Sequence, residues 1–433
     1  MNKTKGTSIT SVISASSVGT MIEWYDFYIF GSLATIISTK FFPQDNPTAA
    51  FLSTLATFAA GFVVRPFGAL FFGRLGDLIG RKYTFMVTLL LMGGATFLIG
   101  CIPSYETIGF MAPVLILLLR LLQGLALGGE YGGAATYVAE HSPEGKRGFM
   151  TAWIQTTATV GLFVSLLVIM GTRAALSAED FDAWGWRVPF WVSILMVLVS
   201  YLIRKNMEES PVFAKAKAAG KTSTNPLKES FGKKLNFKFV LLALFGAVMG
   251  QGVIWYTGQF YAMSFIEKTM NVDKEQVDSL MFIALMLGTP FFLVFGWLSD
   301  KIGRKWIMMA GMLIAIVSYR PIYENMYQTT NLANKVELSS SNSMVNNVNT
   351  VTTVYADSTI QQEIQKTNPA NGAITSTKVL TINSKDKQTL IWLVFIQVLF
   401  VTMVYGPIAA FLVEMFPTKI RYTSMSLPYH IGN

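Results

Sequence analysis

Cysteine and histidine are almost absent from this sequence, which has only Cys101, His141 and His430 of these two residue types. A single cysteine excludes an internal disulfide and leaves no cysteine-based metal site. The two histidines lie far apart at no ligand-like spacing, so we assign structural roles to both. The sequence also offers no nucleophile–base pair and no metal-ligand cluster. We therefore expect neither an enzyme nor a bound metal or other cofactor.

Charged residues are scarce as well. They make up 14% of the chain, against about 25% in typical soluble proteins, while 52% of the residues are hydrophobic. Five stretches lack Asp, Glu, Lys and Arg, and each reaches the roughly 20 residues that cross about 30 Å of hydrocarbon. They are 83–102, 149–172, 239–266, 279–299 and 388–413. The net charge of +9 comes from basic residues in short loops between apolar stretches, so we expect a lipid bilayer and no nucleic acid as partner.

Ten apolar spans can be recognised, and the ninth is interrupted by Arg320 and Pro321. The spans are 9–39, 49–73, 83–102, 108–139, 149–172, 184–204, 238–266, 276–299, 306–323 and 388–415. The first span is long, carries Glu23 and Asp26, and precedes no small-residue cleavage site, so it should remain a helix. Positive residues concentrate at the N-terminus and in the loops after even-numbered spans, which predicts that these segments are cytoplasmic.

Two motifs occur twice. The pattern G-x-L-x-D-x-x-G-R-K begins at Gly73 and again at Gly296, and the pattern E-x-x-P-x-x-x-R begins at Glu140 and again at Glu414. This internal repeat predicts an N-terminal six-helix half (1–205), a cytoplasmic linker (206–237) and a C-terminal half (238–433). The second half carries a polar insertion, 327–387, which the topology places outside. Within it, 351–355 and 374–382 favour β-strands over a disordered loop.

The second half is shorter than the first at its end. Two more spans follow Glu140, whereas the chain stops soon after Glu414, with only the start of an eleventh helix at about 424–433. From the repeat we expect two further helices, so we interpret the chain as a fragment or as the product of a truncated gene.

Further motifs follow one another in a fixed order along the chain. They are Glu23-Trp-Tyr-Asp26-Phe-Tyr, Arg65-Pro-Phe-Gly68, Arg120-x-x-Gln123-Gly124, Gly129-Glu130-Tyr131, Gly185-Trp186-Arg187-Val-Pro189-Phe and Glu209-Ser-Pro211-Val-Phe213. With them the sequence resembles the metabolite:H+ symporters of the major facilitator superfamily, which include carriers of proline/betaine, 2-oxoglutarate, citrate and shikimate. The resemblance implies an all-α integral membrane protein of six plus six helices, here with an incomplete C-terminal half. It also implies a monomer in the bacterial inner membrane.

Five charged residues lie at membrane depth, where each costs about 2.5–3.5 kcal/mol. They are Glu23, Asp26, Arg65, Arg120 and Glu130. Desolvation favours the protonated form of a carboxylate, so Asp26, Glu130 and Glu23 are candidates for proton coupling. The two arginines can hold a substrate carboxylate through paired hydrogen bonds. The alternative is that the five charges neutralise one another and only fix helix packing.

The two G-x-L-x-D-x-x-G-R-K motifs lie at cytoplasmic helix ends. Their residues are Gly73, Asp77, Gly80, Arg81 and Lys82 in the first copy, and Gly296, Asp300, Gly303, Arg304 and Lys305 in the second. The family resemblance implies a gate that latches through breakable ion pairs in one conformation. The alternative is that the positive residues only hold the loops inside. Separately, Gly124, Gly128 and Gly132 recur every four residues, which predicts close packing between helices.

Polar and aromatic residues in apolar surroundings are candidates for lining a central cavity. They are Gln123, Gln155, Trp255, Tyr256, Gln259 and Tyr405, although packing explains most of them equally well. Gly406 and Pro407 predict a local break in the tenth helix.

We interpret the chain as a proton-coupled symporter of a small carboxylate-bearing or zwitterionic metabolite, with protons as the coupling ion, working by alternating access. Two alternatives remain, an uncoupled facilitator of a small polar solute and a non-transporting membrane sensor on a carrier scaffold.

Overall fold

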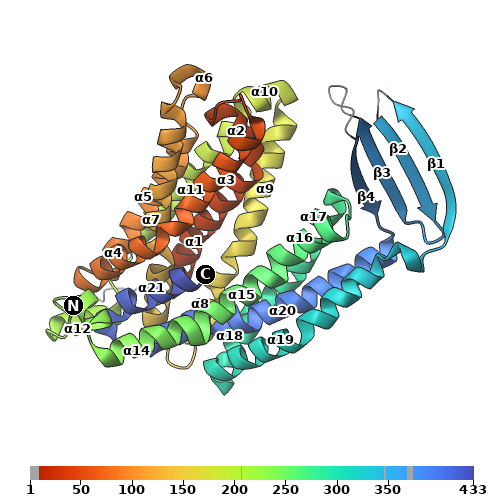
Figure 1. The fold of residues 1–433 in the computed structure, drawn as a ribbon. Helices are drawn as coiled ribbons and strands as arrows, with labels where there is room; N and C mark the ends of the chain where they lie inside the picture. Colours follow the sequence, from red (N-terminus) through yellow and green to blue (C-terminus); the bar gives the residue numbers. More distant parts are fainter. Residues whose placement is uncertain (1–8, 206, 346–347, 368–373) are drawn as a thin grey trace. The chain divides into compact units, whose positions relative to one another are not determined.

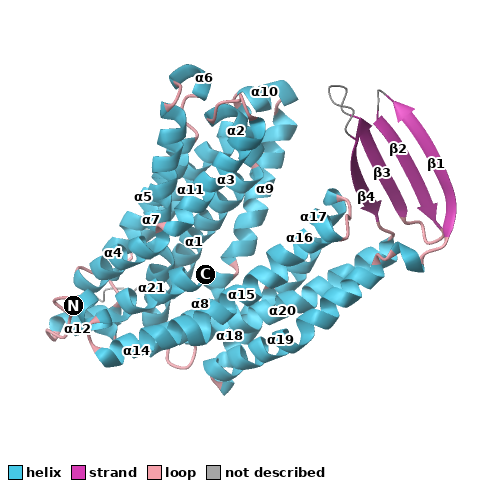
Figure 2. Cartoon of the chain, viewed as in Figure 1, coloured by secondary structure: helices cyan, strands magenta, loops and turns pink. Residues whose placement is uncertain are grey.

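The computed structural model describes residues 9–205, 207–345, 348–367 and 374–433 (Figure 1). Helices dominate, and the strands of these residues form one sheet (Figure 2). Contacts divide the chain into two compact units, which we describe one at a time. Unit 1 contains the residues up to 250 together with 292–307 and 406–433, and unit 2 contains 251–291 and 308–405.

Unit 1 is built from helices. These are α1 (Ile9–Ser32), α2 (Ala34–Phe41), α3 (Pro47–Val63), α4 (Arg65–Leu78), α5 (Arg81–Ile99), α6 (Tyr105–Ile108), α7 (Met111–His141), α8 (Arg147–Gln155), α9 (Thr157–Ala175), α10 (Ala178–Ala183), α11 (Val188–Lys205), α12 (Pro211–Ala218), α13 (Pro226–Phe231), α14 (Lys234–Ala243) and α21 (Arg421–Gly432). It also holds parts of α15 (Met249–Tyr256), α18 (Pro290–Ile302), α19 (Arg304–Thr329) and α20 (Ser384–Met415). The helix α7 packs against α1, α3, α4 and α5, so it lies at the centre of this unit.

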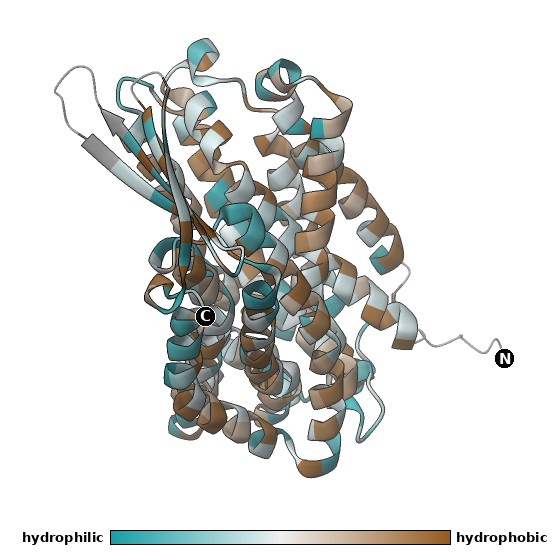
Figure 3. Ribbon diagram, turned by 90° about the vertical axis from the view of Figure 1, so that its right-hand side faces the viewer, coloured by the Kyte–Doolittle hydropathy of each residue, from teal (hydrophilic) through white to brown (hydrophobic). Residues whose placement is uncertain are grey.

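Among the described residues, nine helices or runs of consecutive helical segments are long and apolar enough to cross a membrane, and they coincide with the second to tenth predicted spans. The first predicted span is helical but falls outside this set, because α1 is rich in serine and threonine, carries two carboxylates and ends at Ser32. Large apolar side chains point outward along the helices, for example Leu195 at 61% and Ile316 at 75% exposure. Brown, the colour of hydrophobic residues, is frequent along the helical ribbons of Figure 3, as expected for helices in lipid.

Proline does not end the helices where the sequence suggested a break. The ninth helix, α19, runs through Pro321, and the tyrosines on either side of it donate hydrogen bonds to a neighbouring helix, Tyr319 to the Ile254 carbonyl (3.1 Å) and Tyr323 to the Thr257 carbonyl (2.8 Å). These bonds hold α19 in place across the proline. The predicted break in the tenth helix is likewise wrong, because α20 is continuous through Pro407.

Unit 2 contains the rest of α15, α18, α19 and α20 with α16 (Ala262–Ser264) and α17 (Lys274–Gly288). The segment before α17 is irregular, since π-helical turns replace the α-helix at Leu244–Val248 in unit 1 and at Thr257–Tyr261 and Phe265–Thr269 in unit 2. Such wide turns leave backbone groups less tightly paired than an α-helix does and occur frequently at functional sites.

The polar insertion forms an antiparallel sheet, which we call the insertion sheet. Its strands β1 (Glu337–Val345), β2 (Val348–Tyr355), β3 (Ile360–Thr367) and β4 (Ile374–Thr381) pair in sequence order, so the predicted β structure is confirmed. The last strand continues onto the loop before α17. Leu380 donates to the Asn271 carbonyl (2.7 Å), and its own carbonyl accepts from Asp273 (2.9 Å). The sheet is therefore fixed to the helices of unit 2.

Candidate functional site

The centre of unit 1 holds a buried ion pair between α1 and α7. Asp26 contacts Arg120 at 3.0 Å and accepts a hydrogen bond of 2.8 Å from Gln123, which also donates to Thr96 on α5 at 2.8 Å. Arg120 donates to Gln123 as well, at 2.8 Å. The Arg120 guanidinium lies 4.4 Å from the ring centre of Phe30, and its Nε has no hydrogen-bond partner in the described part of the chain. The sequence-predicted candidates Asp26, Arg120 and Gln123 therefore form one cluster.

A second acidic residue, Glu23, and a second basic residue, Arg65, lie beside this cluster without forming a direct ion pair. Glu23 is one turn before Asp26 and is 8% exposed, yet within the described residues it has no hydrogen bond and no ion pair shorter than 4 Å. Its strongest charge partner is Arg65. The guanidinium of Arg65 stacks on Phe62 at 4.2 Å, and its buried Nε lacks a hydrogen-bond acceptor in the same residues. Glu23 and Arg65 thus have fewer direct hydrogen-bond and ion-pair partners than Asp26 and Arg120 have.

Aromatic and polar groups from α7, α8 and α21 extend this region. Gln155 donates a hydrogen bond of 2.8 Å to the Tyr131 hydroxyl, and the Tyr131 ring stacks on Tyr429 with a centroid distance of 3.6 Å. The next residue, His430, interacts electrostatically with Arg65, and its buried Nε2 has no hydrogen-bond partner among the described residues. The sequence assigned His430 a structural role, and only its position in the predicted eleventh helix pointed toward this region.

Glu130 belongs to a different cluster. Its carboxylate contacts Arg204 at 2.6 Å and accepts a hydrogen bond of 2.7 Å from Thr88. Arg204 also donates to the carbonyls of Phe85 (2.5 Å) and Ala15 (3.3 Å). Four helices, α1, α5, α7 and α11, meet at this fully buried pair. The arrangement favours the packing role that we held open for Glu130, because its charge has a dedicated partner that the sequence did not identify.

The remaining cavity candidates lie in unit 2. Trp255 and Tyr405 are both buried, with ring centres 6.4 Å apart, and Trp255 contacts Tyr256 at 5.0 Å. Gln259 is half-buried in the π-helical turn Thr257–Tyr261. The structure thus brings Trp255, Tyr256 and Tyr405 together within this unit.

Each aspartate of the repeated motif caps a helix that belongs to the opposite repeat. Asp77 on α4 accepts hydrogen bonds from the backbone N–H groups of Tyr422 (3.3 Å) and Thr423 (2.8 Å) at the start of α21. Asp300 on α18 accepts from the N–H groups of Gly148 (2.9 Å) and the following residue (2.8 Å) at the start of α8. A carboxylate is stabilised there because the first N–H groups of a helix are unpaired and carry partial positive charge.

Ion pairs extend the first cap into a group that we call the first gate network. Arg81 contacts Asp77 at 3.1 Å and Glu140 at 3.5 Å, and Glu140 contacts Arg421 at 2.7 Å. Arg81 also donates to the Thr418 carbonyl at 2.6 Å. Three of the four charged residues are fully buried or nearly so, and Arg421 is 12% exposed.

The second gate network has the same composition. Arg304 contacts Asp300 at 2.8 Å and Glu414 at 3.0 Å, and Glu414 lies 3.9 Å from Arg147. In both networks the aspartate, the first arginine and the glutamate come from one repeat, and the last arginine comes from the other. The second repeated motif, E-x-x-P-x-x-x-R, therefore supplies a glutamate and an arginine to these ion-pair networks, a contact that the sequence did not reveal.

The glycines of the gate motifs serve turns and close contacts. Gly80 and Gly303 have φ angles of 138° and 98°, which other residues rarely adopt. A Cβ at Gly73 would lie 2.9 Å from the Thr423 Cα, and one at Gly296 would lie 2.7 Å from the Gly148 carbonyl oxygen. The lysines do not join the gate networks, since Lys82 donates to the Lys205 carbonyl at 3.0 Å and Lys305 lies over Trp306 at 5.4 Å.

The glycine stripe of α7 packs as predicted. A Cβ at Gly124 would lie 2.0 Å from the Gly61 carbonyl oxygen, and one at Gly128 would lie 2.2 Å from that of Arg65. At Gly132 it would lie 2.0 Å from the Ser426 hydroxyl on α21. The absence of side chains at these positions therefore lets α3, α4 and α21 approach α7.

Comparisons with known proteins give this arrangement a context. Residues 12–237 match the family described as "Sugar (and other) transporter". The chain is 32% identical over 439 residues to the inner membrane metabolite transport protein YhjE of Escherichia coli K12, covering 98% of this chain and 85% of that protein. It is 35% identical over 314 residues to a proline/betaine transporter of Salmonella typhimurium, covering 70% of this chain, and it spans only 62% of that relative's length.

A shikimate transporter of E. coli K12 is 35% identical over 312 residues, covering 71% of this chain and 70% of that protein. Among solved structures, the proton:xylose symporter XylE bound to 6-bromo-6-deoxy-D-glucose superimposes with a TM-score of 0.70 at 16% identity. The match covers 98% of this chain and 86% of XylE. At this identity the likeness concerns the fold, which is that of a multi-pass, all-α membrane protein.

Proposed function

Because the chain belongs to the sugar (and other) transporter family of the major facilitator superfamily, we propose that it moves a small carboxylate-bearing or zwitterionic metabolite together with protons across the bacterial inner membrane, with its N-terminus in the cytoplasm. The observation that carries this proposal is the buried Asp26–Arg120 pair, at 3.0 Å between α1 and α7. Relatives named as transporters of proline/betaine and of shikimate, all of which bear carboxylates, support the substrate class.

The pair offers a simple route to coupling. While Asp26 is ionised it occupies Arg120, and protonation of Asp26 leaves the guanidinium without a counter-charge. An unpaired buried charge costs about 3–5 kcal/mol, so the protonated carrier gains most from a substrate carboxylate that takes the place of Asp26. Proton and substrate then favour each other's binding, as thermodynamic linkage requires. The neighbouring Arg65, with an unpaired Nε, and Glu23 supply a second cation and a second proton acceptor.

The gate networks fit a closed state of alternating access. In this state Asp77 holds α21 against α4, and Asp300 holds α8 against α18. We propose that both caps release when the carrier opens on the cytoplasmic side, so that the two repeats separate there. The metabolite then leaves and Asp26 loses its proton on the same side.

The proposal is tested with the purified chain in proteoliposomes. Labelled L-proline, glycine betaine, shikimate and 2-oxoglutarate are offered with and without an inward proton gradient. We expect the gradient to accumulate one of these compounds and the interior to acidify during uptake. Asp26→Asn should abolish accumulation but retain exchange of labelled for unlabelled compound, because exchange needs no net proton movement. Arg120→Gln should lose both.

A matched control is Asp182→Asn, at an exposed position in α10, which should behave as the parent chain does. Uptake without acidification, unaffected by Asp26→Asn, would favour an uncoupled facilitator. Binding of a compound without any exchange would favour a sensor, and normal uptake of a carboxylate by Arg120→Gln would refute the role of that arginine.

A further inference from the structure

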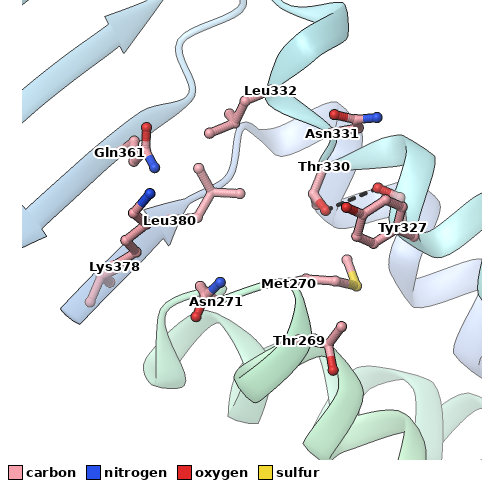
Figure 4. Close-up of a pocket in the computed structure, with 11 residues that line it drawn as sticks. Thr269, Met270, Asn271, Tyr327, Thr330, Asn331, Leu332, Gln361, Lys378 and Leu380 are labelled. Atoms are coloured by element: carbon pink, nitrogen blue, oxygen red, sulfur yellow. Dashed lines mark hydrogen bonds between the residues drawn. The ribbon is translucent and has the colours of Figure 1, made fainter. Parts of the chain in front are cut away.

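The insertion sheet and the helix ends of unit 2 enclose an open cavity of about 230 Å³ (Figure 4). Gln361 and Lys378 reach it from β3 and β4. Tyr327 reaches it from the last turn of α19, Thr330 from the residue after α19, and Thr269 from the end of the last π-helical turn. All of these residues belong to unit 2. The cavity is smaller than the roughly 300 Å³ at the lower end for drug-sized ligands, so it suits a small metabolite.

The polar side chains that line the cavity include a cation and several hydrogen-bond donors but no anion. Lys378 contributes an ammonium group, three side chains contribute amides, two contribute aliphatic hydroxyls and Tyr327 contributes a phenol, whereas no lining residue is a carboxylate. In the described residues, neither Lys378, the Tyr327 hydroxyl nor the Thr269 hydroxyl forms a hydrogen bond with another side chain. These donors are therefore available to a ligand. Met270, Leu332 and Leu380 complete an apolar floor.

One carboxylate lies near the lining and modulates it. Glu363 is 3.9 Å from the Lys378 ammonium, at the limit of an ion pair, and it already accepts hydrogen bonds from Gln365 (3.1 Å) and Ser376 (2.9 Å). The Lys378 side chain is 54% exposed, and its ammonium has three N–H donors, so donors remain for an incoming anion. Glu363 weakens the attraction of the site for anions without filling the cavity.

The walls of the cavity are fixed before any ligand arrives. The lower wall is held by the Leu380–Asn271 hydrogen bond of 2.7 Å, and Asn271 adopts a left-handed φ of 55° that asparagine tolerates better than most residues. At the base of the sheet, Lys335 bridges Asp357 in the β2–β3 turn and Asp386 at the start of α20. A preformed site loses little conformational freedom on binding.

We propose that this cavity binds a small hydroxylated carboxylate at a site separate from the Asp26–Arg120 cluster. Lys378 pairs with the carboxylate of the ligand, and the amides and hydroxyls of the lining bond its hydroxyl groups. The absence of carboxylates from the lining disfavours compounds that carry only a positive charge, such as amines. This inference does not depend on proton coupling or on the transported substrate.

The test places a single cysteine in the cavity of the full-length purified chain. Cys101→Ser removes the native thiol, and Thr269→Cys introduces a reporter at an exposed lining position. The rate of alkylation by a maleimide is measured with and without shikimate or D-gluconate, both hydroxylated carboxylates. The ligands are used at about 10 mM, above the usual range of metabolite affinities, which ends near 1 mM.

We expect alkylation to slow in proportion to 1 + [L]/Kd, about elevenfold at ten times Kd. The methyl ester of shikimate, which lacks the charge, should give little protection. A reporter at Ser341→Cys on β1, outside the cavity, should not respond. Lys378→Gln should abolish protection at Thr269→Cys, and Glu363→Gln should strengthen it.

Three results would overturn the proposal. The first is equal alkylation with and without both carboxylates, and the second is protection that survives Lys378→Gln. The third comes from Arg120→Gln, which disables the proposed transport site. If that substitution alone removed the protection, the reporter would be sensing the transport site and not the cavity. Protection that persists in Arg120→Gln, even in a chain that transports nothing, supports the cavity independently of the proposed function.

Discussion

Asp77→Asn is expected to loosen the contact between α4 and α21. The substitution keeps the shape of the side chain but removes its charge. The Asp77 carboxylate accepts hydrogen bonds from two backbone N–H groups of α21 and forms an ion pair with Arg81 at 3.1 Å. Asparagine offers one acceptor oxygen, and its amide nitrogen faces a second N–H group that it cannot accept from. Since Asp77 is fully buried, solvent does not compensate for the loss.

The size of the effect follows from the bonds that are lost. A hydrogen bond to a charged group contributes about 1.5–3 kcal/mol, so losing one such bond shifts the closed–open equilibrium about 10- to 150-fold toward the open state. Both aspartates of the gate motifs make equivalent caps, and the second gate network remains intact in this variant. We therefore expect a measurable open population and not complete release of α21.

A buried cysteine can report this opening. Thr423 lies on α21 against Gly73 of α4 and is fully buried, and cysteine is close to threonine in size, so Thr423→Cys in a Cys101→Ser chain should be tolerated. Its alkylation rate follows the open population when opening is fast. Asp77→Asn should raise that rate about 10-fold or more. The exposed Asp45→Asn serves as a control, and an unchanged rate in Asp77→Asn would refute the role of the cap.

Three further expectations concern stability. Arg204→Met should lower the free energy of unfolding by about 3–5 kcal/mol, since it leaves the buried Glu130 carboxylate without its partner. Adding Glu130→Leu should restore most of this stability in thermal or denaturant unfolding. A double variant that does not recover would argue against a purely structural pair. Gly128→Leu should prevent accumulation of folded protein, because its Cβ would lie 2.2 Å from a backbone oxygen; normal expression would contradict the close packing. Burial raises the pKa of Asp357, but hydrogen bonds from Lys335 and a neighbouring threonine outweigh burial and lower the pKa to about 2. The base of the insertion sheet should therefore stay closed at neutral pH and loosen as the pH falls from about 4 toward 2. Hydrogen exchange of the sheet, corrected for the intrinsic rate at each pH, measures this loosening, and exchange that is independent of pH would refute it.

Much of the membrane fold could be predicted from hydropathy and loop charge, because lipid requires long apolar helices with satisfied backbones. The local irregularities could not. The helix α19 passes through Pro321, and the hydrogen bonds of Tyr319 and Tyr323 to a neighbouring helix, which support it there, are a tertiary effect. The β-rich character of the insertion was visible in its valine and threonine content, but its attachment through Leu380 was not.

The charged residues at membrane depth were found because each is costly there, and Asp26, Arg120 and Gln123 do meet. Their division into clusters was not predictable. Arg204 lies at the end of a predicted span, where an arginine usually marks only the cytoplasmic side, and its pairing with Glu130 depends on how α7 and α11 pack. His430 was undervalued for the same reason, since no local pattern brings it near Arg65.

The crossed composition of the gate networks also constrains how this chain can change. A substitution at Glu140 removes the partner of Arg421, which lies in the opposite repeat, and leaves the partner of Arg147, in its own motif, untouched. A change that compensates for the lost partner of Arg421 can therefore arise in the opposite repeat. Neither repeat can be replaced by a foreign sequence without disturbing both gate networks, so each repeat limits the sequence of the other.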